Sequence, residues 1–210
     1  MYLPRAFAEH DLAHLDALIA RDPFITLVTV AGDGAAQVNH LPVLYTRDGQ
    51  DILLEGHWAR PNPQATHVGD ALAVVHGPHA YVSPSAYPDK ETAARVPTWN
   101  YAVVHLHGTL ETVDDTASLA DLVQRLSLHF ETSVGRDWRF EPERDDHLRQ
   151  LRGIIGFRLR VTRPVLKFKL SQNHPAANIT AVADDLAARD DADARAVATL
   201  MRAALQDAAT

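Results

Sequence analysis

The sequence has no cysteine, and this absence excludes disulfide bonds, thiolate metal ligands and cysteine nucleophiles. The same absence fits a protein that works in a reducing compartment. No apolar run approaches the roughly 20 residues that a membrane-spanning helix needs. The N-terminus lacks a basic region followed by an apolar one, which is the pattern of a secretion signal. From these absences we predict a cytoplasmic protein.

Positive charge is also scarce. The chain has 20 Lys and Arg against 27 Asp and Glu, which gives a formal net charge of −7 at pH 7. Such a charge repels nucleic acid, and the sequence shows neither a long basic patch nor a helix-turn-helix pattern. These features argue against direct contact with DNA. The serines do not show the glycine pattern of a nucleophile elbow, which disfavours a hydrolase.

The composition is that of a folded globular protein. Of the 210 residues, 46% are hydrophobic and 22% are charged, so the chain can bury a sizeable core and is not expected to hold long disordered segments. It shows no internal repeat and no linker. We therefore predict one domain over residues 1–210, with a C-terminal helical extension at about 175–208.

Runs rich in β-branched and aromatic residues predict antiparallel strands. Residues 24–30, 37–45 and 52–57 are separated by glycine-containing turns, so we expect a three-stranded meander. Further strands are expected at 71–77, 80–84, 101–108 and 154–169. Gly77-Pro78 predicts a bulge or a barrel corner between two of them.

Apolar stripes at helical spacing predict helices at the ends of the sheet and not between its strands. Helices are expected at 9–21, near 64–68, at about 114–132, at about 141–152, and once or twice within 175–208. Asp114 or Asp115 can cap the 114–132 helix, and Pro142 suits the first turn of the next one. Tight turns cannot join parallel neighbours, so the predicted class is mainly β (α+β): an antiparallel barrel with N-terminal, middle and C-terminal helices.

The stretch 56–64 combines groups that can hold an anion. Gly56 allows a close approach of the backbone, and His57 and Arg60 can carry or donate positive charge. Asn62 can cap the short helix that follows, whose free N–H groups add positive potential. A phosphate is therefore a candidate ligand. The alternative is a surface loop with one solvated arginine.

The stretch 96–108 begins as a loop and continues as a strand. Trp99 and Asn100 lie at the junction, where a rigid strand can hold the side chains of a loop. An indole offers a stacking surface and a side-chain amide offers a donor beside an acceptor, which suits a flat heterocycle. The alternative is a core tryptophan with a turn-forming asparagine.

The sequence has 12 histidines, most of them scattered. His105 and His107 would share one face of a strand, and His76 and His79 are close in the sequence. A haem or metal site built from such a pair is an alternative function. No carboxylate accompanies them at regular spacing.

Six motifs spread over nearly the whole chain, in the same order, resemble the PaiB family. They lie at 1–4, 39–42, 56–64, 77–84, 96–101 and 169–173. That family is described as FMN-binding negative transcriptional regulators. It is built on the split β-barrel of pyridoxamine-phosphate oxidases and flavin reductases, usually as homodimers. The resemblance therefore implies an FMN-binding split barrel, FMN as the cofactor, and a homodimer with the cofactor site at the subunit interface.

The resemblance also assigns residues to the cofactor. The loop of His57, Arg60 and Asn62 would hold the phosphate, and Trp99 and Asn100 would reach the flavin, in one arrangement from the other subunit. The full set of implied cofactor-binding residues is Asn39, His40, Leu41, His57, Trp58, Arg60, Asn62, Gln64, Trp99, Asn100, Lys169, Ser171 and Gln172. The oxidases carry more cationic groups around the phosphate than the one arginine of this loop, so a modest affinity is expected.

Two functions of different classes follow. The first is an FMN-binding homodimer of the PaiB-like negative transcriptional regulator type. The alternative is a flavin-dependent oxidoreductase, either an NAD(P)H:flavin reductase or an enzyme similar to pyridoxamine-phosphate oxidase. In that case the cofactor carries the chemistry, and His40, His105 or Tyr101 could donate protons. The sequence assigns no catalytic residue.

Overall fold

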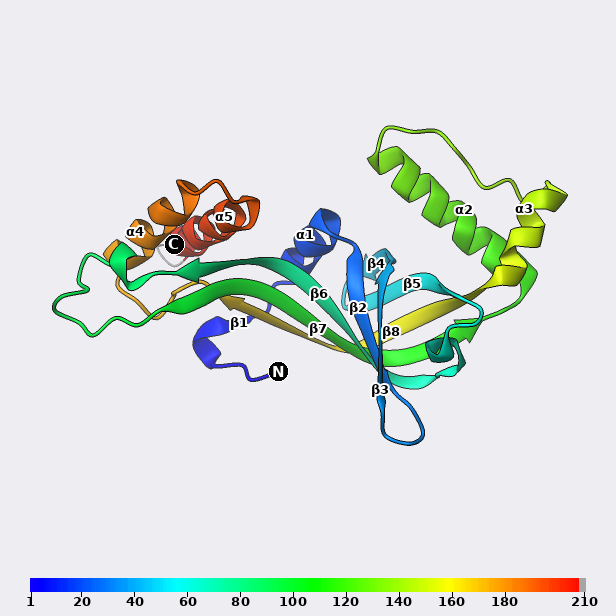
Figure 1. Ribbon diagram of the computed structural model, residues 1–210, viewed down its shortest axis with the longest axis horizontal. Helices are drawn as coiled ribbons and strands as arrows, with labels where there is room; N and C mark the ends of the chain where they lie inside the picture. The colour runs from blue at the N-terminus through cyan, green and yellow to red at the C-terminus, as the bar shows by residue number, and fades with distance from the viewer. Residues whose placement is uncertain (208–210) are drawn as a thin grey trace. The chain divides into compact units, whose positions relative to one another are not determined.

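The computed structural model describes residues 1–207 (Figure 1). Within these residues the strands are β1 (Ala8–Glu9), β2 (Phe24–Val30), β3 (Ala36–Pro42), β4 (Leu44–Asp48), β5 (Asp51–Ala59), β6 (Gly69–Val82), β7 (Thr98–Val113) and β8 (Ile154–Lys169). The α-helices are α1 (Ala13–Arg21), α2 (Thr116–Ser133), α3 (Asp145–Gln150), α4 (Ala176–Ala187) and α5 (Ala192–Asp207). Short 3-10 helices are η1 (Arg5–Phe7), η2 (Pro63–Thr66), η3 (Pro84–Ala86) and η4 (Leu151–Gly153). Position 208, the end of the expected C-terminal extension, lies outside the described residues.

The strands form one sheet in the order β3-β2-β6-β7-β8-β5-β4, and β1 pairs with β8. In the described part of the chain this order ends at β3 and at β4, so the sheet is not closed. β2 pairs antiparallel with β3 and β6, and β5 pairs antiparallel with β4 and β8. An antiparallel sheet with helices outside it confirms the predicted mainly β, α+β class. No helix within residues 1–207 is long and apolar enough to span a membrane.

The chain forms two compact units. The first unit holds Met1–Leu15, His76–Val104 and the chain from Val165 onward, and the second unit holds Asp16–Val75 and His105–Pro164. Each unit is assembled from separate stretches of sequence, so neither is a contiguous domain. The single domain over residues 1–210 stays a prediction.

The expected three-stranded meander is wrong. The predicted strand 37–45 divides at Val43 into β3 and β4, and these pair with different neighbours, β2 and β5. Pro42 gives the physical reason, because a proline has no N–H to continue a ladder. Val43 is buried and anchors the turn between the two strands. Two separate hairpins result, and β3 is left at one end of the sheet.

The strands expected at 71–77 and 80–84 are one strand. β6 runs without interruption from Gly69 to Val82. Its pairing with β2 covers residues 71–74, so Pro78 lies beyond that ladder and removes no hydrogen bond from it.

Three helix boundaries differ from the prediction. α1 begins at Ala13 and not at residue 9, because the side chain of Asp11 accepts the Ala13 N–H at 2.8 Å. α3 begins at Asp145, so Pro142 lies before it and not in its first turn. The helix expected near 64–68 is the 3-10 helix η2, which starts one residue earlier.

In the second unit, β5 presents its two faces to different partners. Leu54 and Trp58 point into the core, where the Trp58 ring lies 4.7 Å from the ring of Phe157 on β8. Glu55 and His57 point the other way, toward α2. The sequence predicted the matching alternation along β8, in which apolar residues 155, 157, 159 and 161 share the core face.

α2 lies against the second face of β5 and β8. The side chain of Asp115 accepts the Ser118 N–H at 2.8 Å, which confirms one of the two predicted caps. Gly156 lets the helix come close, because a Cβ there would lie 3.1 Å from Leu119 and from Leu122. The close contact places α2 above Glu55 and His57.

In the first unit, α4 and α5 form an antiparallel pair after the end of β8 (Figure 1). Ile179, Val182 and Leu186 of α4 are buried together with Val197 and Met201 of α5. The predicted C-terminal extension therefore contains two helices with an apolar face in common.

Candidate functional site

The residues that the sequence assigned to the cofactor fall into both units. The second unit holds Asn39, His40, Leu41, His57, Trp58, Arg60, Asn62 and Gln64. The first unit holds Trp99, Asn100, Lys169, Ser171 and Gln172.

Three side-chain amides of the second unit meet where β3 and η2 come together, and we call Asn39, Asn62 and Gln64 the amide cluster. Asn39 Nδ2 donates to Gln64 Oε1 at 2.9 Å, and Asn62 Nδ2 donates to Asn39 Oδ1 at 2.8 Å. Asn62 Oδ1 accepts the backbone N–H of Gln64 at 3.0 Å, so Asn62 caps η2 as predicted. The cluster is polar, hydrogen-bonded and uncharged.

Gln64 holds the amide cluster to the core. Its side chain is fully buried, and Nε2 donates to the carbonyls of Leu27 and Gln37 at 3.1 and 3.0 Å. Nε2 also lies 3.2 Å from Thr29 Oγ1, and Oε1 accepts from Trp58 Nε1 at 3.0 Å. Trp58 is buried as well. Gln64 and Trp58 therefore support the cluster from inside the fold.

β3 carries the next group of predicted contacts on an edge of the sheet. β3 stands at one end of the strand order, so alternate backbone N–H and C=O groups point away from β2. His40 Nδ1 lies 3.0 Å from Thr26 Oγ1, and its ring stacks on Phe24 at 6.5 Å between centroids. Leu41 pairs with Ile25. The edge offers donors and acceptors in a row.

His57 does not join the amide cluster. Neighbouring residues of a strand point to opposite faces, so His57 lies on the face of β5 away from Trp58. Its imidazole lines a pocket of about 220 Å³ together with Val123, Phe140 and His147. Burial lowers the pKa of His57, which favours the neutral imidazole.

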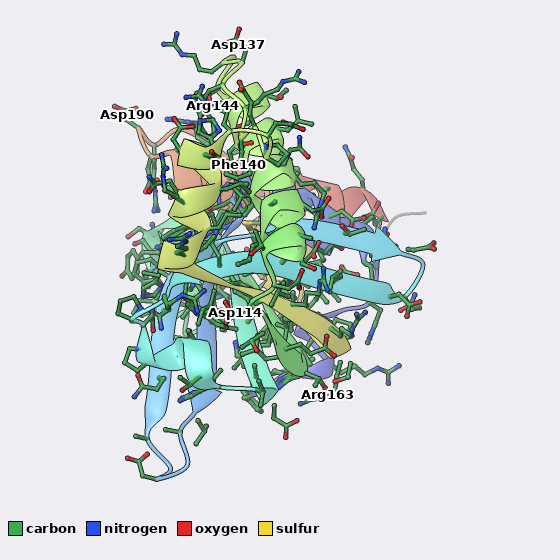
Figure 2. All side chains as sticks on the ribbon, turned by 90° about the vertical axis from the view of Figure 1, so that its right-hand side faces the viewer. Asp114, Asp137, Phe140, Arg144, Arg163 and Asp190 are labelled. Atoms are coloured by element: carbon green, nitrogen blue, oxygen red, sulfur yellow. The ribbon has the colours of Figure 1, made fainter. Side chains whose placement is uncertain are left out.

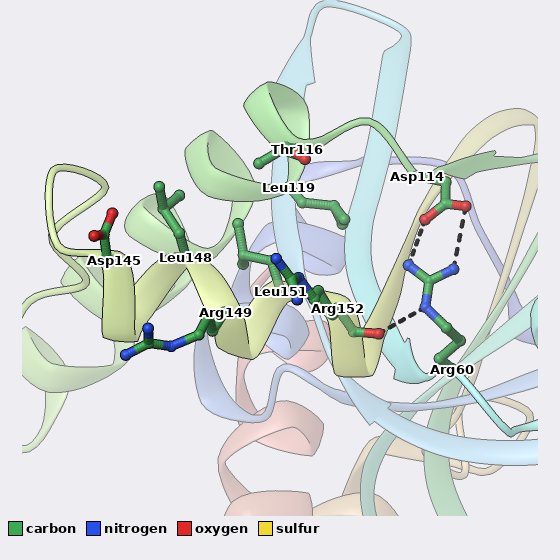
Figure 3. A pocket seen from close by; sticks show the side chains of 9 residues that line it. All are labelled: Arg60, Asp114, Thr116, Leu119, Asp145, Leu148, Arg149, Leu151 and Arg152. Atoms are coloured by element: carbon green, nitrogen blue, oxygen red, sulfur yellow. Dashed lines mark hydrogen bonds and ion pairs between the residues drawn. The ribbon is translucent and has the colours of Figure 1, made fainter.

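The side chain of Arg60 is bound by groups of the protein itself. Its guanidinium makes a two-pronged ion pair with Asp114, through contacts of 3.2 and 2.5 Å, as Figure 3 shows. Nε donates to the Arg152 carbonyl at 2.8 Å, and Nη2 donates to the Ile154 carbonyl at 2.9 Å. Four hydrogen bonds leave at most one of the five guanidinium N–H donors for a ligand. Arg60 fastens the loop after β5 to β7 and β8.

In the first unit, Asn100 and Ser171 form a buried pair. Asn100 Nδ2 donates to Ser171 Oγ at 2.9 Å and lies 3.4 Å from Met201 Sδ. Ser171 has a φ of 66°, a left-handed conformation that is uncommon for a residue other than glycine. Gln172 accepts the Leu170 N–H at 2.7 Å and so closes the same turn. The three residues shape the end of β8 under α5.

Trp99 and Lys169 lie next to each other in the first unit. Lys169 Nζ donates to the Trp99 carbonyl at 2.6 Å and to Thr98 Oγ1 at 2.5 Å. The Trp99 side chain is 52% exposed, and its ring lies 5.9 Å from both His79 and Tyr81. Burial, with Lys167 nearby, lowers the pKa of Lys169. The predicted stacking surface exists as an exposed aromatic platform beside a cation.

The sequence did not reveal an ion-pair cluster under α2. The buried carboxylate of Glu55 accepts from Arg125 Nη1 at 2.7 Å and from Arg158 Nε at 3.1 Å. Burial opposes ionisation of Glu55, but the hydrogen bonds from the two arginines lower its pKa overall. The only signal for Arg158 was its place on the polar face of β8.

A second missed feature is a pocket of about 400 Å³ that contains Arg60, Arg149 and Arg152. Arg149 and Arg152 are three residues apart, a spacing that predicts a common helix face but no ligand. The pocket forms only because α3 and η4 fold beside the start of α2, which the sequence did not reveal.

The rings of His105 and His107 are neighbours on β7. The rings of His105 and His107 lie 6.3 Å apart between centroids. In the described part of the chain, no three residues among His, Cys, Asp and Glu are placed to hold a metal ion.

A family model described as "Putative FMN-binding domain" matches residues 1–163. The chain belongs to this family. Protease synthase and sporulation protein PAI 2 of Bacillus subtilis is 30% identical to it over 207 residues, which cover 96% of each chain. The resemblance to the PaiB family is confirmed, and the cofactor of this FMN-binding family is FMN, as that resemblance implied.

Solved structures confirm the split-barrel fold of this FMN-binding family member. The FAD and heme binding protein from Mycobacterium smegmatis aligns with a TM-score of 0.54 at 16% identity, over 83% of this chain and 78% of that one. The flavocytochrome Anf3 from Azotobacter vinelandii aligns with a TM-score of 0.53 at 16% identity, over 80% and 72%. At these identities the comparison concerns the fold.

The residues of the second unit fit the uncharged polar parts of FMN. Asn62 keeps one amide N–H beyond its bond to Asn39, and the free edge of β3 supplies backbone donors and acceptors. Ribityl hydroxyls and a pyrimidine edge need such groups. The amide cluster brings no cation for the phosphate, and the modest affinity expected from the sequence stays a prediction.

Proposed function

We propose that the chain is an FMN-binding homodimer of the PaiB regulator type, and that FMN contacts the amide cluster and the edge of β3. The observation that carries this proposal is the amide cluster itself. It is a pre-formed polar group beside an edge strand, in a chain of an FMN-binding family. His40 and Leu41 would meet the cofactor through the backbone of β3. Gln64 and Trp58 would act by positioning the cluster.

The test measures FMN affinity through the quenching of flavin fluorescence on binding. We expect Asn62→Ala to weaken FMN binding by up to about tenfold, since it removes one neutral hydrogen bond to the cofactor, worth at most about 1.4 kcal/mol. Asn173→Ala removes an exposed amide of the first unit and serves as the matched control. A folded Asn62→Ala protein with unchanged FMN affinity would contradict the proposal.

A substitution of Arg60 tests whether this residue binds the FMN phosphate, as the family resemblance implied. Because its donors are taken by Asp114 and two carbonyls, we expect Arg60→Gln to change FMN affinity less than about twofold. A tenfold loss on this substitution would return Arg60 to the phosphate site.

The aromatic platform of the first unit is a separate candidate contact. Trp99 offers an exposed indole face and Lys169 a cation beside it, which together suit a flat, electron-poor ring. Trp99→Ala should reduce the quenching of bound flavin by the indole, and Tyr45→Phe, in the second unit, should not. Equal quenching in both variants would show that Trp99 does not contact the flavin.

The homodimer is supported by an apolar face on the β2–β3 hairpin. Phe24, Val30 and Val38 are 51%, 65% and 50% exposed and share one side of the hairpin with Val28. An exposed apolar patch of this kind is typical of an interface. Val38→Asp should shift the mass measured by light scattering from dimer to monomer, while Val68→Asp, another exposed valine, should not.

The oxidoreductase alternative is favoured by one feature. His40 lies on the edge strand with a hydrogen-bonded imidazole that can exchange protons. FMN supplies hydride and electron transfer when bound. Turnover of NADH or NADPH that falls on His40→Ala, with FMN affinity unchanged, would support this function. The same assay without turnover, and a specific shift of promoter DNA that withstands moderate salt, would support the regulatory role.

A further inference from the structure

A pocket of about 400 Å³ lies in the second unit (Figure 3). It is formed by the start of α2, by α3 with η4, and by the loop after β5. We call it the arginine pocket, and its lining residues are Arg60, Asp114, Thr116, Leu119, Asp145, Leu148, Arg149, Leu151 and Arg152. The amide cluster contributes no residue to it.

Two guanidinium groups in the arginine pocket are without a partner. Arg60 is neutralised by Asp114, with contacts of 3.2 and 2.5 Å. Within residues 1–207, the side chains of Arg149 and Arg152 form neither an ion pair nor a hydrogen bond, and both are exposed. Three arginines face two aspartates in the lining, so the pocket carries one net positive charge in a chain whose net charge is −7. A positive pocket on an acidic protein selects anions.

The start of α2 adds to this field. α2 is 18 residues long, and its first residue, Thr116, lines the pocket. The positive end of the helix macrodipole therefore faces the cavity, although the cap by Asp115 offsets part of it. The Thr116 hydroxyl makes no hydrogen bond within the described chain and can serve a ligand.

The opposite wall of the arginine pocket is apolar and rigid. Leu119 and Leu151 are 2% and 3% exposed and belong to a packed cluster with Phe140, against which Leu148 also packs. In Figure 3 the Arg152 side chain turns from η4 toward Leu119 and the start of α2. Cations on one side and leucines on the other suit a molecule with an anionic head and an apolar body.

We propose that the arginine pocket binds a small organic anion, in which a phosphate or carboxylate group is joined to an apolar or aromatic body. Arg152 holds the head group, and Leu119, Leu148 and Leu151 cover the body. Arg60 and Asp114 form the fixed floor. This site is separate from the FMN site and can be filled while FMN is bound.

The test uses the FMN-saturated protein and isothermal titration with phenyl phosphate, benzoate and inorganic phosphate. Phenyl phosphate should bind at least about fivefold tighter than inorganic phosphate, because only the former covers the leucines. The ratio of phenyl phosphate to benzoate affinity then assigns the head group as phosphate or carboxylate. Equal binding of phenyl phosphate and inorganic phosphate would overturn the amphipathic pocket.

Substitutions locate the site. Arg152→Gln should weaken phenyl phosphate binding at least about fivefold, since it removes one charged contact. Arg163→Gln, on β8, removes the same charge from an exposed arginine outside the pocket, and it should leave binding within about twofold (Figure 2). Equal effects of Arg152→Gln and Arg163→Gln would overturn the proposal.

FMN binding gives the second readout. Arg152→Gln should retain FMN with unchanged affinity, so a loss of phenyl phosphate binding alone identifies a second site. A parallel loss of FMN in Arg152→Gln would make the pocket part of the cofactor site and overturn the proposal of a separate one. Asn62→Ala should show the reverse behaviour, so the failure of one proposal is distinguishable from the failure of the other.

Discussion

The two faces of β5 carry polar groups of opposite kinds. On the face of Trp58, the amide cluster is uncharged, tied to the core through Gln64, and joined by hydrogen bonds between amides, backbone and indole. On the face of Glu55 and His57, the groups are ionisable and lie beneath α2. We call the first the neutral face and the second the charged face. One strand therefore separates hydrogen-bonding chemistry from charge.

Residues that are adjacent in the sequence of β5 belong to different sites. His57 and Trp58 are adjacent, but the period of two along a strand sends their side chains to opposite faces. A fully buried polar group must find its partners within the protein, and an amide is satisfied at lower cost than an ion. The neutral face can therefore lie in the core, whereas the charged face needs α2 with its arginine.

The neutral face is tested by Gln64→Met. The substitution keeps the size of the side chain but removes the hydrogen bonds of Gln64 with the Leu27 and Gln37 carbonyls and with the Trp58 indole N–H. Each unsatisfied buried group is costly, so we expect the free energy of unfolding to fall by roughly 3 kcal/mol or more. Urea unfolding followed by tryptophan fluorescence measures this loss.

The matched control is Gln124→Met, because Gln124 is an exposed glutamine on α2. Its unfolding free energy should change by less than about 0.5 kcal/mol. Similar stability of the Gln64→Met and Gln124→Met proteins would show that the buried amide network does not hold the neutral face together.

The charged face is tested by Glu55→Gln. The neutral amide removes the Glu55 carboxylate from Arg125 and Arg158, and Arg125 keeps only its exposed pair with Asp121. We expect a loss of roughly 2 kcal/mol in the free energy of unfolding. The loss stays below that of a fully buried pair, because the Arg125 side chain is 38% exposed. Glu111→Gln breaks the exposed ion pair with Arg160 and should cost much less.

The same variant has a pH signature. The pKa of Glu55 is lowered in the folded state, so its contribution to stability is complete above the usual pKa of a glutamate. It is lost as the pH falls through the lowered value, because the folded protein must then take up the proton that the unfolded chain already holds. Glu55→Gln should remove this part of the acid destabilisation. An unchanged acid limb would show that the Glu55 carboxylate contributes nothing to stability.

Much of the fold could be predicted because local rules are strong along this chain. The alternation on β8, the cap of α2 by Asp115 and the cap of η2 by Asn62 all follow from short-range preferences. The division of the predicted strand at Val43 was missed, since the sequence does not say which partners β3 and β4 choose. Pairing over a long range is decided by the whole sheet.

The candidate site was predictable only in part. The type of group at Asn39, Asn62 and Trp99 suited a flavin, and the amides do meet. The role of Arg60 was not visible, because its partner Asp114 is 54 residues away and belongs to the end of another strand. A cation in a loop indicates an anion, but the sequence alone does not say whether that anion is a ligand or an aspartate.

The smallest expected effect concerns His57. Its pKa is lowered by burial, so the folded protein resists the proton that the unfolded chain accepts below a pH of about 6.5. Stability is therefore complete above that pH and declines as the pH falls toward the lowered value, with a slope of at most about 1.4 kcal/mol per pH unit for one proton. His57→Gln should flatten the decline measured by chemical unfolding between pH 7 and 5, which are chosen to bracket the usual histidine range. Part of the decline in stability should remain in this variant, because burial also lowers the pKa of His107 and of His174.

The control for that slope is His129→Gln, which removes an exposed imidazole from α2 and should leave the decline unchanged. If His57→Gln and His129→Gln gave the same slope as the unaltered protein, His57 would be free to take up a proton in the folded state. The charged face would then be open to water at this position, and His57 would add a charge to it. A flatter slope for His57→Gln alone would instead show that His57 stays neutral beneath α2, so the charge on this face would be limited to Glu55 and its arginines.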